Sequence, residues 1–348
     1  MNVRNFRKIE WWIPLCAIIL CGIGLVALFS ASYDSGLDEF KKQAMWMGIS
    51  IGIMVVVMLI DYKILIKLSP ILYGIAILSV IAVLFTKPIS GARSWFVIGN
   101  DLFSFQPAET AKVFVILFLA YVISTIQRNG RDEINRIPKL ALILLTIAVP
   151  VLLIIMEPDY GTATAYIIAF LVMIFVAGIN KKYIISAIAV VIIAVPLIYN
   201  FILPQHAKSR IDTFLHPESD PKGAGYNILQ SKLAIGAGEV TGMGVLNGNQ
   251  TQLGYLYPKT TDFIFSVIGE EMGFVVACSV IILNVIIITK SIQVAKGIKD
   301  DAGAYVAAGI AGIFLFHTLE NIGMTMGLLP ITGVPLLFVS YGRKFNDD

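Results

Sequence analysis

Long apolar runs dominate the chain, and polar residues gather in the segments between them. The runs lie near residues 11–31, 43–60, 68–86, 108–126, 138–157, 160–179, 183–203, 263–289 and 303–326. Each run is close to the roughly 20 residues that one helix needs to cross a bilayer. Because the runs are continuous and do not alternate, they predict an all-α polytopic membrane protein, a helical bundle of nine spans.

The composition agrees with this pattern, since 57% of the 348 residues are hydrophobic and only 14% are charged. We expect residues 1–348 to form a single transmembrane domain. With the N-terminus in the cytoplasm, the connections that carry most of the lysines and arginines are cytoplasmic, as the positive-inside rule requires. The formal net charge of +3 suits contact with anionic membrane lipids and gives no support to nucleic-acid binding.

Two connections on the predicted outer side are much longer than ordinary links between helices, at residues 87–107 and 204–262. The second connection, between spans seven and eight, is a large extracytoplasmic loop. Its residues Tyr226, Leu229 and Leu233 share one face of a predicted helix, so we expect the loop to be structured and to lie against the outer membrane surface.

Charged residues from three distant segments lie at the outer ends of spans. Glu109 and Lys112 open the fourth span, Glu157 and Asp159 lie in the turn between the fifth and sixth, and Asp262 opens the eighth. An ionised group near a bilayer is costly and calls for a functional reason. Their common membrane level predicts one shared cavity at the outer leaflet.

Each of these residues also has a purely structural interpretation. Glu109 and Lys112 are spaced i, i+3, which suits a salt bridge as well as a substrate site. Asp159 precedes a helical run and is a good helix cap. His317 and Glu320, also i, i+3 in the ninth span, are expected to bond to each other and not to catalyse.

Several motifs, in one order from the first span to Gly342, resemble the signatures of the SEDS family (shape, elongation, division and sporulation proteins). These motifs are Gly91-Ala92-Arg93-Ser94-Trp95, Gln106-Pro107-Ala108-Glu109-Thr110-Ala111-Lys112, Pro158-Asp159-Tyr160-Gly161-Thr162-Ala163, Asp220-Pro221-Lys222-Gly223-Ala224-Gly225-Tyr226, Gln230-Ser231, Thr261-Asp262-Phe263-Ile264-Phe265, Asn321-Ile322-Gly323-Met324 and Val339-Ser340-Tyr341-Gly342. The resemblance is closest to the rod-shape branch of the family.

The resemblance implies a peptidoglycan glycosyltransferase that polymerises lipid II into a growing glycan strand at the outer face of the cytoplasmic membrane. It also implies a class B penicillin-binding protein as partner, and Asp262 as the catalytic residue. The residues that would line or support the substrate cavity are Arg93, Trp95, Glu109, Lys112, Asp159, Arg210, Gln230 and Lys259.

Sugar polymerisation needs a base for an acceptor hydroxyl and positive charge near a pyrophosphate leaving group. Asp262 is the candidate base, and Lys112, Arg93 and Arg210 are candidates to balance the pyrophosphate. No cofactor is required by the sequence; a divalent cation, Mg²⁺ or Mn²⁺, is a candidate whose ligands the sequence does not identify.

Two other functions compete with polymerisation. A carrier (flippase) of the lipid-linked precursor would use the same polar cavity for binding only, but transporters often place their charges at the midplane and show inverted repeats. A non-catalytic scaffold would leave the outer carboxylates unexplained. We therefore expect an enzyme.

The C-terminus departs from the family pattern. The family continues into a tenth span, whereas this chain turns to an atypical polar tail at residues 343–348. We expect a truncated or frame-shifted chain that lacks the last span.

Overall fold

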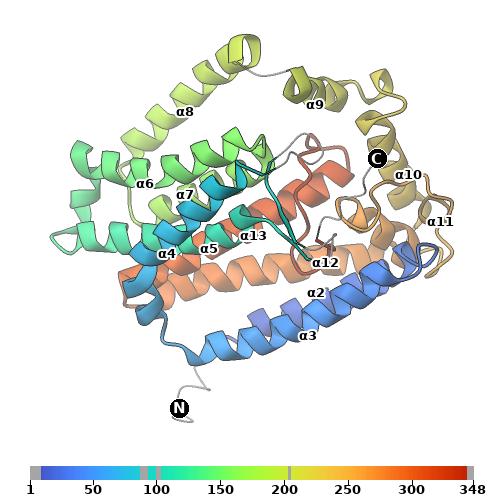
Figure 1. The fold of residues 1–348 in the computed structure, drawn as a ribbon, viewed down its shortest axis with the longest axis horizontal. Coiled ribbons are helices and arrows are strands. Elements are labelled where there is room, and N and C mark those ends of the chain that lie inside the picture. The colour runs from blue at the N-terminus through green and yellow to red at the C-terminus, as the bar shows by residue number, and fades with distance from the viewer. Residues whose placement is uncertain (1–8, 87–92, 99–102, 203–204, 343–348) are drawn as a thin grey trace.

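The computed structural model describes residues 9–86, 93–98, 103–202 and 205–342 (Figure 1). The polar tail at 343–348 lies outside the described residues. Within the described part of the chain, eight helices are long and apolar enough to cross a membrane, and a ninth apolar helix has 17 residues. The predicted all-α membrane bundle is therefore confirmed.

The nine apolar helices follow the predicted runs in order. They are α2 (Trp12–Ala31), α3 (Asp38–Leu59), α4 (Tyr62–Val83), α5 (Pro107–Gln127), α6 (Ile137–Met156), α7 (Tyr160–Val176), α8 (Lys181–Leu197), α12 (Ile264–Gly297) and α13 (Asp301–Thr325). A short π-helical turn, η2 (Ile198–Ile202), continues α8, and a 3₁₀ turn, η1 (Arg131–Asn135), joins α5 to α6.

Several helices begin or end outside the apolar run that predicted them. The run at 68–86 belongs to a helix that already begins at Tyr62, because the Asp61 carboxylate accepts a hydrogen bond from the Lys63 amide at 2.9 Å and caps it. The run at 263–289 belongs to a helix that continues to Gly297. Charged side chains near a helix end can reach the membrane interface. A helix can therefore extend beyond the apolar run in its sequence.

Helix α13 is the central element of the bundle, packed against α12, α7 and α5 (Figure 1). One buried cluster joins α4, α5, α6 and α7 to its first half, and a second joins α2 and α12 to its second half. Small residues allow this close contact: a Cβ on Gly309 would lie 2.8 Å from Ile116 Cγ2, and one on Gly312 would lie 2.7 Å from Ala169 Cα.

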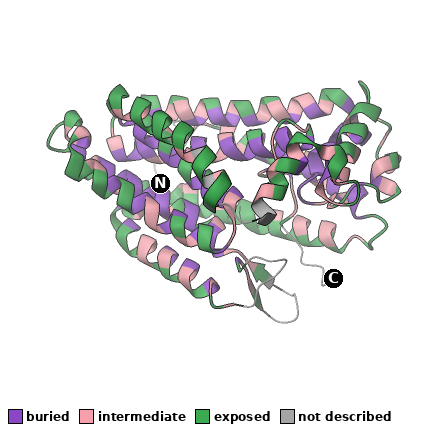
Figure 2. Cartoon of the chain, turned by 90° about the horizontal axis from the view of Figure 1, so that it is seen from above, coloured by how far each residue is buried: buried purple, intermediate pink, exposed green. Residues whose placement is uncertain are grey.

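Helices α3 and α8 lie at the edge of the bundle, and none of the residues whose burial is described in their apolar windows is buried. Figure 2 shows the buried positions inside the bundle and the exposed positions along its outer faces. Exposed apolar residues on a spanning helix are suited to contact with lipid chains.

Both long connections contain regular structure. The first contains an antiparallel hairpin of β1 (Phe96–Ile98) and β2 (Phe103–Phe105). The second contains α9 (Gln205–Leu215), η3 (Pro217–Ser219), α10 (Ala224–Ala237) and α11 (Asn249–Gln252). The expectation that the second connection is structured is confirmed.

Helix α10 packs on α12, but with a different face from the one that the apolar pattern marked. Ile228 and Ala234 are buried, whereas Leu229 and Leu233 are exposed. The marked face therefore points away from the bundle.

Helix α12 is broken at Gly273, whose φ of 78° and ψ of −178° are not helical. The long connection supplies hydrogen bonds at the break: the Met243 amide donates to the Glu270 carbonyl, and the Phe274 amide donates to the Glu239 carbonyl, both at 2.9 Å. Glycine tolerates this positive φ without the steric cost of a Cβ.

The contact between α13 and α7 predicts a clear difference between two glycine substitutions. Gly312→Ala should lower the free energy of unfolding by about 1–3 kcal/mol, because its new methyl group meets the Ala169 backbone. Gly52→Ala in α3 is the matched control, since nothing lies within 4 Å of its Cβ position. Thermal midpoints of the detergent-purified variants measure the difference, and equal midpoints would contradict this packing.

Candidate functional site

Asp262 lies directly before α12 in a turn whose backbone is held from other elements. The Asn321 side-chain amide on α13 donates to the Asp262 carbonyl at 3.0 Å and to the Val334 carbonyl at 2.9 Å. The Tyr341 amide donates to the Thr260 carbonyl at 3.1 Å. Asp262 is only 6% exposed. A carboxylate on so constrained a backbone is well placed to act at a fixed point.

A buried cation lies at the start of α5. Lys112 is 4% exposed, and its ammonium donates to Glu109 Oε1 at 2.8 Å. The ammonium also lies 2.9 Å from His317 Nε2, while His317 Nδ1 lies 2.9 Å from the Pro335 carbonyl oxygen. A carbonyl oxygen can only accept, so Nδ1 carries the proton and Nε2 accepts from Lys112. The imidazole is therefore neutral, and Lys112 has a third hydrogen left to donate.

The expected bond between His317 and Glu320 is wrong. His317 bonds to Lys112, and Glu320 instead accepts from the Thr332 hydroxyl at 2.6 Å. The i, i+3 spacing allows the pair to form, but both side chains instead form hydrogen bonds with residues on other segments of the chain. The expected pairing of Glu109 with Lys112 is confirmed.

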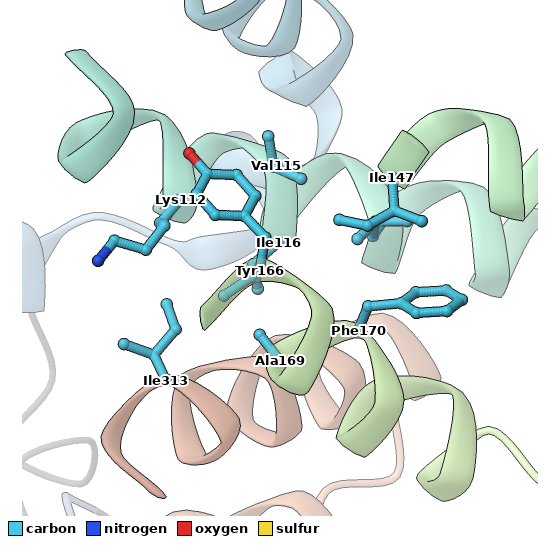
Figure 3. A pocket seen from close by; sticks show the side chains of 9 residues that line it. Lys112, Val115, Ile116, Ile147, Tyr166, Ala169, Phe170 and Ile313 are labelled. Carbon is cyan, nitrogen blue, oxygen red and sulfur yellow. The ribbon is translucent and has the colours of Figure 1, made fainter. Parts of the chain in front are cut away.

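A small hollow lies next to Lys112 among α5, α6, α7 and α13 (Figure 3). It is lined by Lys112, Val115, Ile116, Leu119, Ile147, Tyr166, Ala169, Phe170 and Ile313. Figure 3 shows the Lys112 ammonium at one end, directed away from Phe170. Saccharides need several convergent polar groups, so this apolar hollow belongs to the packing of the bundle.

Asp159 caps α7, as its sequence position suggests. Its Oδ1 accepts from the Thr162 amide at 3.0 Å, and its Oδ2 accepts from the Thr162 hydroxyl at 2.9 Å. The Gln106 side chain, just before α5, also donates to Oδ2, at 2.7 Å. Asp159 therefore joins the beginnings of α5 and α7.

Glu157, in the turn between α6 and α7, is fully buried. Among the described residues, neither of its carboxyl oxygens has a hydrogen-bond partner. The Ser94 hydroxyl donates to its backbone carbonyl at 3.4 Å. Burial raises the pKa of Glu157 to about 8, and the nearby charge of Asp159 adds to the effect. The raised pKa favours the protonated, neutral form of this acid at neutral pH.

Lys259 lies three residues before Asp262 and donates to the Thr251 carbonyl at 2.8 Å. Burial lowers the pKa of Lys259, while the charges of Asp34, Glu271 and Glu39 oppose that shift. The contact is thus internal to the long connection.

The other predicted substrate residues lie on the two connections. Exposed Arg93 donates from Nη1 to the Leu84 carbonyl at 3.4 Å, and partly buried Trp95 follows it. Exposed Arg210 on α9 donates to the Ile331 carbonyl at 3.5 Å. Gln230 lies partly buried on α10. Two of the predicted residues, Glu109 and Lys112, are in direct contact; a role in substrate binding stays a prediction for all eight.

Helix α13 contacts both Lys112 and the backbone of Asp262, a relation that the sequence alone did not indicate. His317 and Asn321 are four residues apart, so they lie on one face of the helix about one turn apart. His317 holds Lys112, and Asn321 holds the backbone of Asp262. The polar residues in an otherwise apolar helix were the available signal.

No group of three or more His, Cys, Asp or Glu side chains able to hold a metal ion occurs within the described residues. A divalent cation at this site stays a prediction.

Comparisons with known proteins agree on one family. The family model described as Cell cycle protein, FtsW/RodA/SpoVE, matches residues 10–343. The peptidoglycan glycosyltransferase MrdB of Escherichia coli K12 is 35% identical, with 94% of this chain and 88% of that protein covered. The peptidoglycan glycosyltransferase RodA of Treponema pallidum is 29% identical, with 98% and 95% covered.

A solved peptidoglycan synthase complex, in which polymerization and crosslinking are coordinated, contains a chain with a similar fold. Its TM-score is 0.80 at 26% identity, with 96% of this chain and 92% of that chain covered.

The buried ion pair predicts unequal effects of removing its two charges. Glu109→Gln should lower the free energy of unfolding by about 3 kcal/mol, because it leaves an ammonium that is 4% exposed without its anion. Lys112→Met should cost less than about 1.5 kcal/mol, because Glu109 is 34% exposed and keeps water contact. Thermal midpoints of both variants provide the comparison; a more damaging Lys112→Met would contradict this account.

Proposed function

The chain belongs to the FtsW/RodA/SpoVE family of cell cycle proteins, and from this membership we propose how it works as a peptidoglycan glycosyltransferase of cell-wall elongation. Its substrate is lipid II, which it polymerises into glycan strands. Asp262 is the general base. The observation that carries this assignment is a buried carboxylate at the head of α12, on a backbone bonded to α13 and to the C-terminal segment.

The reaction is a single displacement at the anomeric carbon of the donor sugar. The Asp262 carboxylate takes the proton of the acceptor hydroxyl, whose oxygen bonds to that carbon. The bond to the lipid pyrophosphate breaks, and its electron pair leaves with the pyrophosphate. Since one carboxylate serves as base and none is assigned as nucleophile, the anomeric configuration inverts.

Donor groups for the leaving pyrophosphate come from three elements. Lys112 offers its remaining N–H from α5, and the exposed side chains of Arg93 and Arg210 offer guanidinium groups from the two connections. Arginine suits this task because its planar donors match phosphate oxygens. Mg²⁺ or Mn²⁺ would add charge through the pyrophosphate oxygens.

The protein is a multi-pass membrane protein, and its active face is extracytoplasmic. The lysine and arginine bias of the connections supports a cytoplasmic N-terminus. With that orientation Asp262, Glu109 and Asp159 all lie at the outer ends of their helices. A class B penicillin-binding protein is the partner that crosslinks the strands, in keeping with the similar chain in the peptidoglycan synthase complex.

Asp262→Asn should reduce glycan-strand formation from labelled lipid II by at least about 100-fold, because the amide keeps the size but cannot accept the proton. The parent and the variant are assayed in vesicles together with the partner. Asp38→Asn, at a carboxylate that is 74% exposed, is the matched control and should polymerise like the parent.

Equal polymer from Asp262→Asn and the parent would remove Asp262 as the base. If the folded parent makes no polymer with its partner, the alternative function as a carrier of the lipid-linked precursor would be favoured.

A further inference from the structure

We propose that Glu270 and Glu271, the paired acids before the break in α12, position Asp262 by clamping the segment that delivers it to the site. The inference rests on the proposed function of Asp262. Neither acid touches the substrate in this account; both act through residues 239–261 of the long connection.

The two acids lie deep inside the protein, since Glu270 is 0% and Glu271 is 2% exposed. Charged groups buried in a membrane protein are costly and persist where they have specific partners. Glu270 has three: its Oε1 accepts from the Gln250 amide at 2.6 Å, and its Oε2 accepts from the Thr251 amide at 3.0 Å and the Thr251 hydroxyl at 2.6 Å. Glu270 thus accepts three hydrogen bonds from two residues of α11.

Glu271 connects the same segment to α2. Its Oε1 accepts from the Ser30 hydroxyl at 2.7 Å and from the Gln252 side chain at 2.8 Å. The Ser30 oxygen in turn accepts from the Leu246 amide at 3.1 Å. Residues of α11 and Leu246 before it are therefore hydrogen-bonded to side chains of α2 and α12.

The clamp reaches the catalytic turn through Thr251. Its amide and hydroxyl bond to Glu270, and its carbonyl accepts from the Lys259 ammonium at 2.8 Å. Lys259 lies in the turn that ends at Asp262, where the Phe263 amide donates to the Pro258 carbonyl at 3.2 Å. A displaced Thr251 would therefore move the base.

The fit around the acids leaves little room for adjustment. A Cβ on Gly248 would lie 2.6 Å from Glu270 Oε2, and one on Gly242 would lie 2.2 Å from the Glu271 carbonyl oxygen. Glycines at these positions let the connection approach the acids closely. Such close contacts favour a rigid connection before Asp262. Rigidity matters because a shift of about 1 Å in a reacting group can lower the rate about 100-fold.

Removing one hydroxyl tests the clamp with little change of shape. Thr251→Val should lower the kcat of lipid II polymerisation about tenfold and leave KM within about twofold, because the base is misplaced while substrate contacts remain. Thr251→Ser keeps the hydroxyl and should restore most of the rate. Glu270→Gln should lower kcat further, because its NH₂ group would face amide donors.

Thr289→Val is the matched control, since the exposed Thr289 hydroxyl bonds only to carbonyls of its own helix. All variants are assayed in vesicles with the partner, with thermal midpoints measured alongside. A parent-like kcat for Thr251→Val, a raised KM at unchanged kcat, or a loss matched by loss of folded protein would each overturn the clamp.

Asp262→Asn, run beside these variants, separates the two proposals. If it is inactive and Thr251→Val is normal, only the clamp fails. If it still polymerises, the base assignment fails, and the clamp fails with it.

Discussion

A helix that breaks inside a membrane protein frees backbone groups that water cannot satisfy, and the rest of this structure depends on how α12 meets that constraint. The connection between α8 and α12 runs back to the break, where Met243 and Glu239 pair with the backbone on either side of Gly273. These hydrogen bonds fasten the long connection to the bundle. The break fixes the loop, and the loop carries Asp262.

A second constraint comes from α13, which is shared by both buried clusters. Its small residues let α7 and α5 approach closely, and its polar residues then reach across to neighbouring elements. Because His317 and Asn321 lie about one turn apart, Lys112 and the Asp262 backbone are both hydrogen-bonded to the same helix. A shift of α13 would move both together.

The sequence was informative where one local property decided the structure. Run lengths located nine helices, and the acid at the head of an apolar run singled out Asp262. The sequence was uninformative where contacts between residues far apart in the chain determined the structure. Ser30 and Glu271 are 241 positions apart, and no spacing rule predicts their hydrogen bond.

The same reason explains the wrong pairing of His317 with Glu320, since spacing shows which residues can meet but not which partners they take. The run at 263–289 looked continuous, so the two acids inside it were missed. Two adjacent acids followed by a glycine within an apolar run are the signal that could have located the break.

The buried group around Lys112 also limits how charge can be distributed during the reaction. Lys112 and Glu109 cancel, and His317 is neutral because its Nε2 lone pair faces the ammonium, so the group as a whole carries no net charge. Lys112 can donate a hydrogen bond to a phosphate oxygen but adds little net positive potential. In the proposed mechanism, the charge that balances the departing pyrophosphate then has to come from groups outside this pair. The proposed donors Arg93 and Arg210, or a bound cation, would supply it.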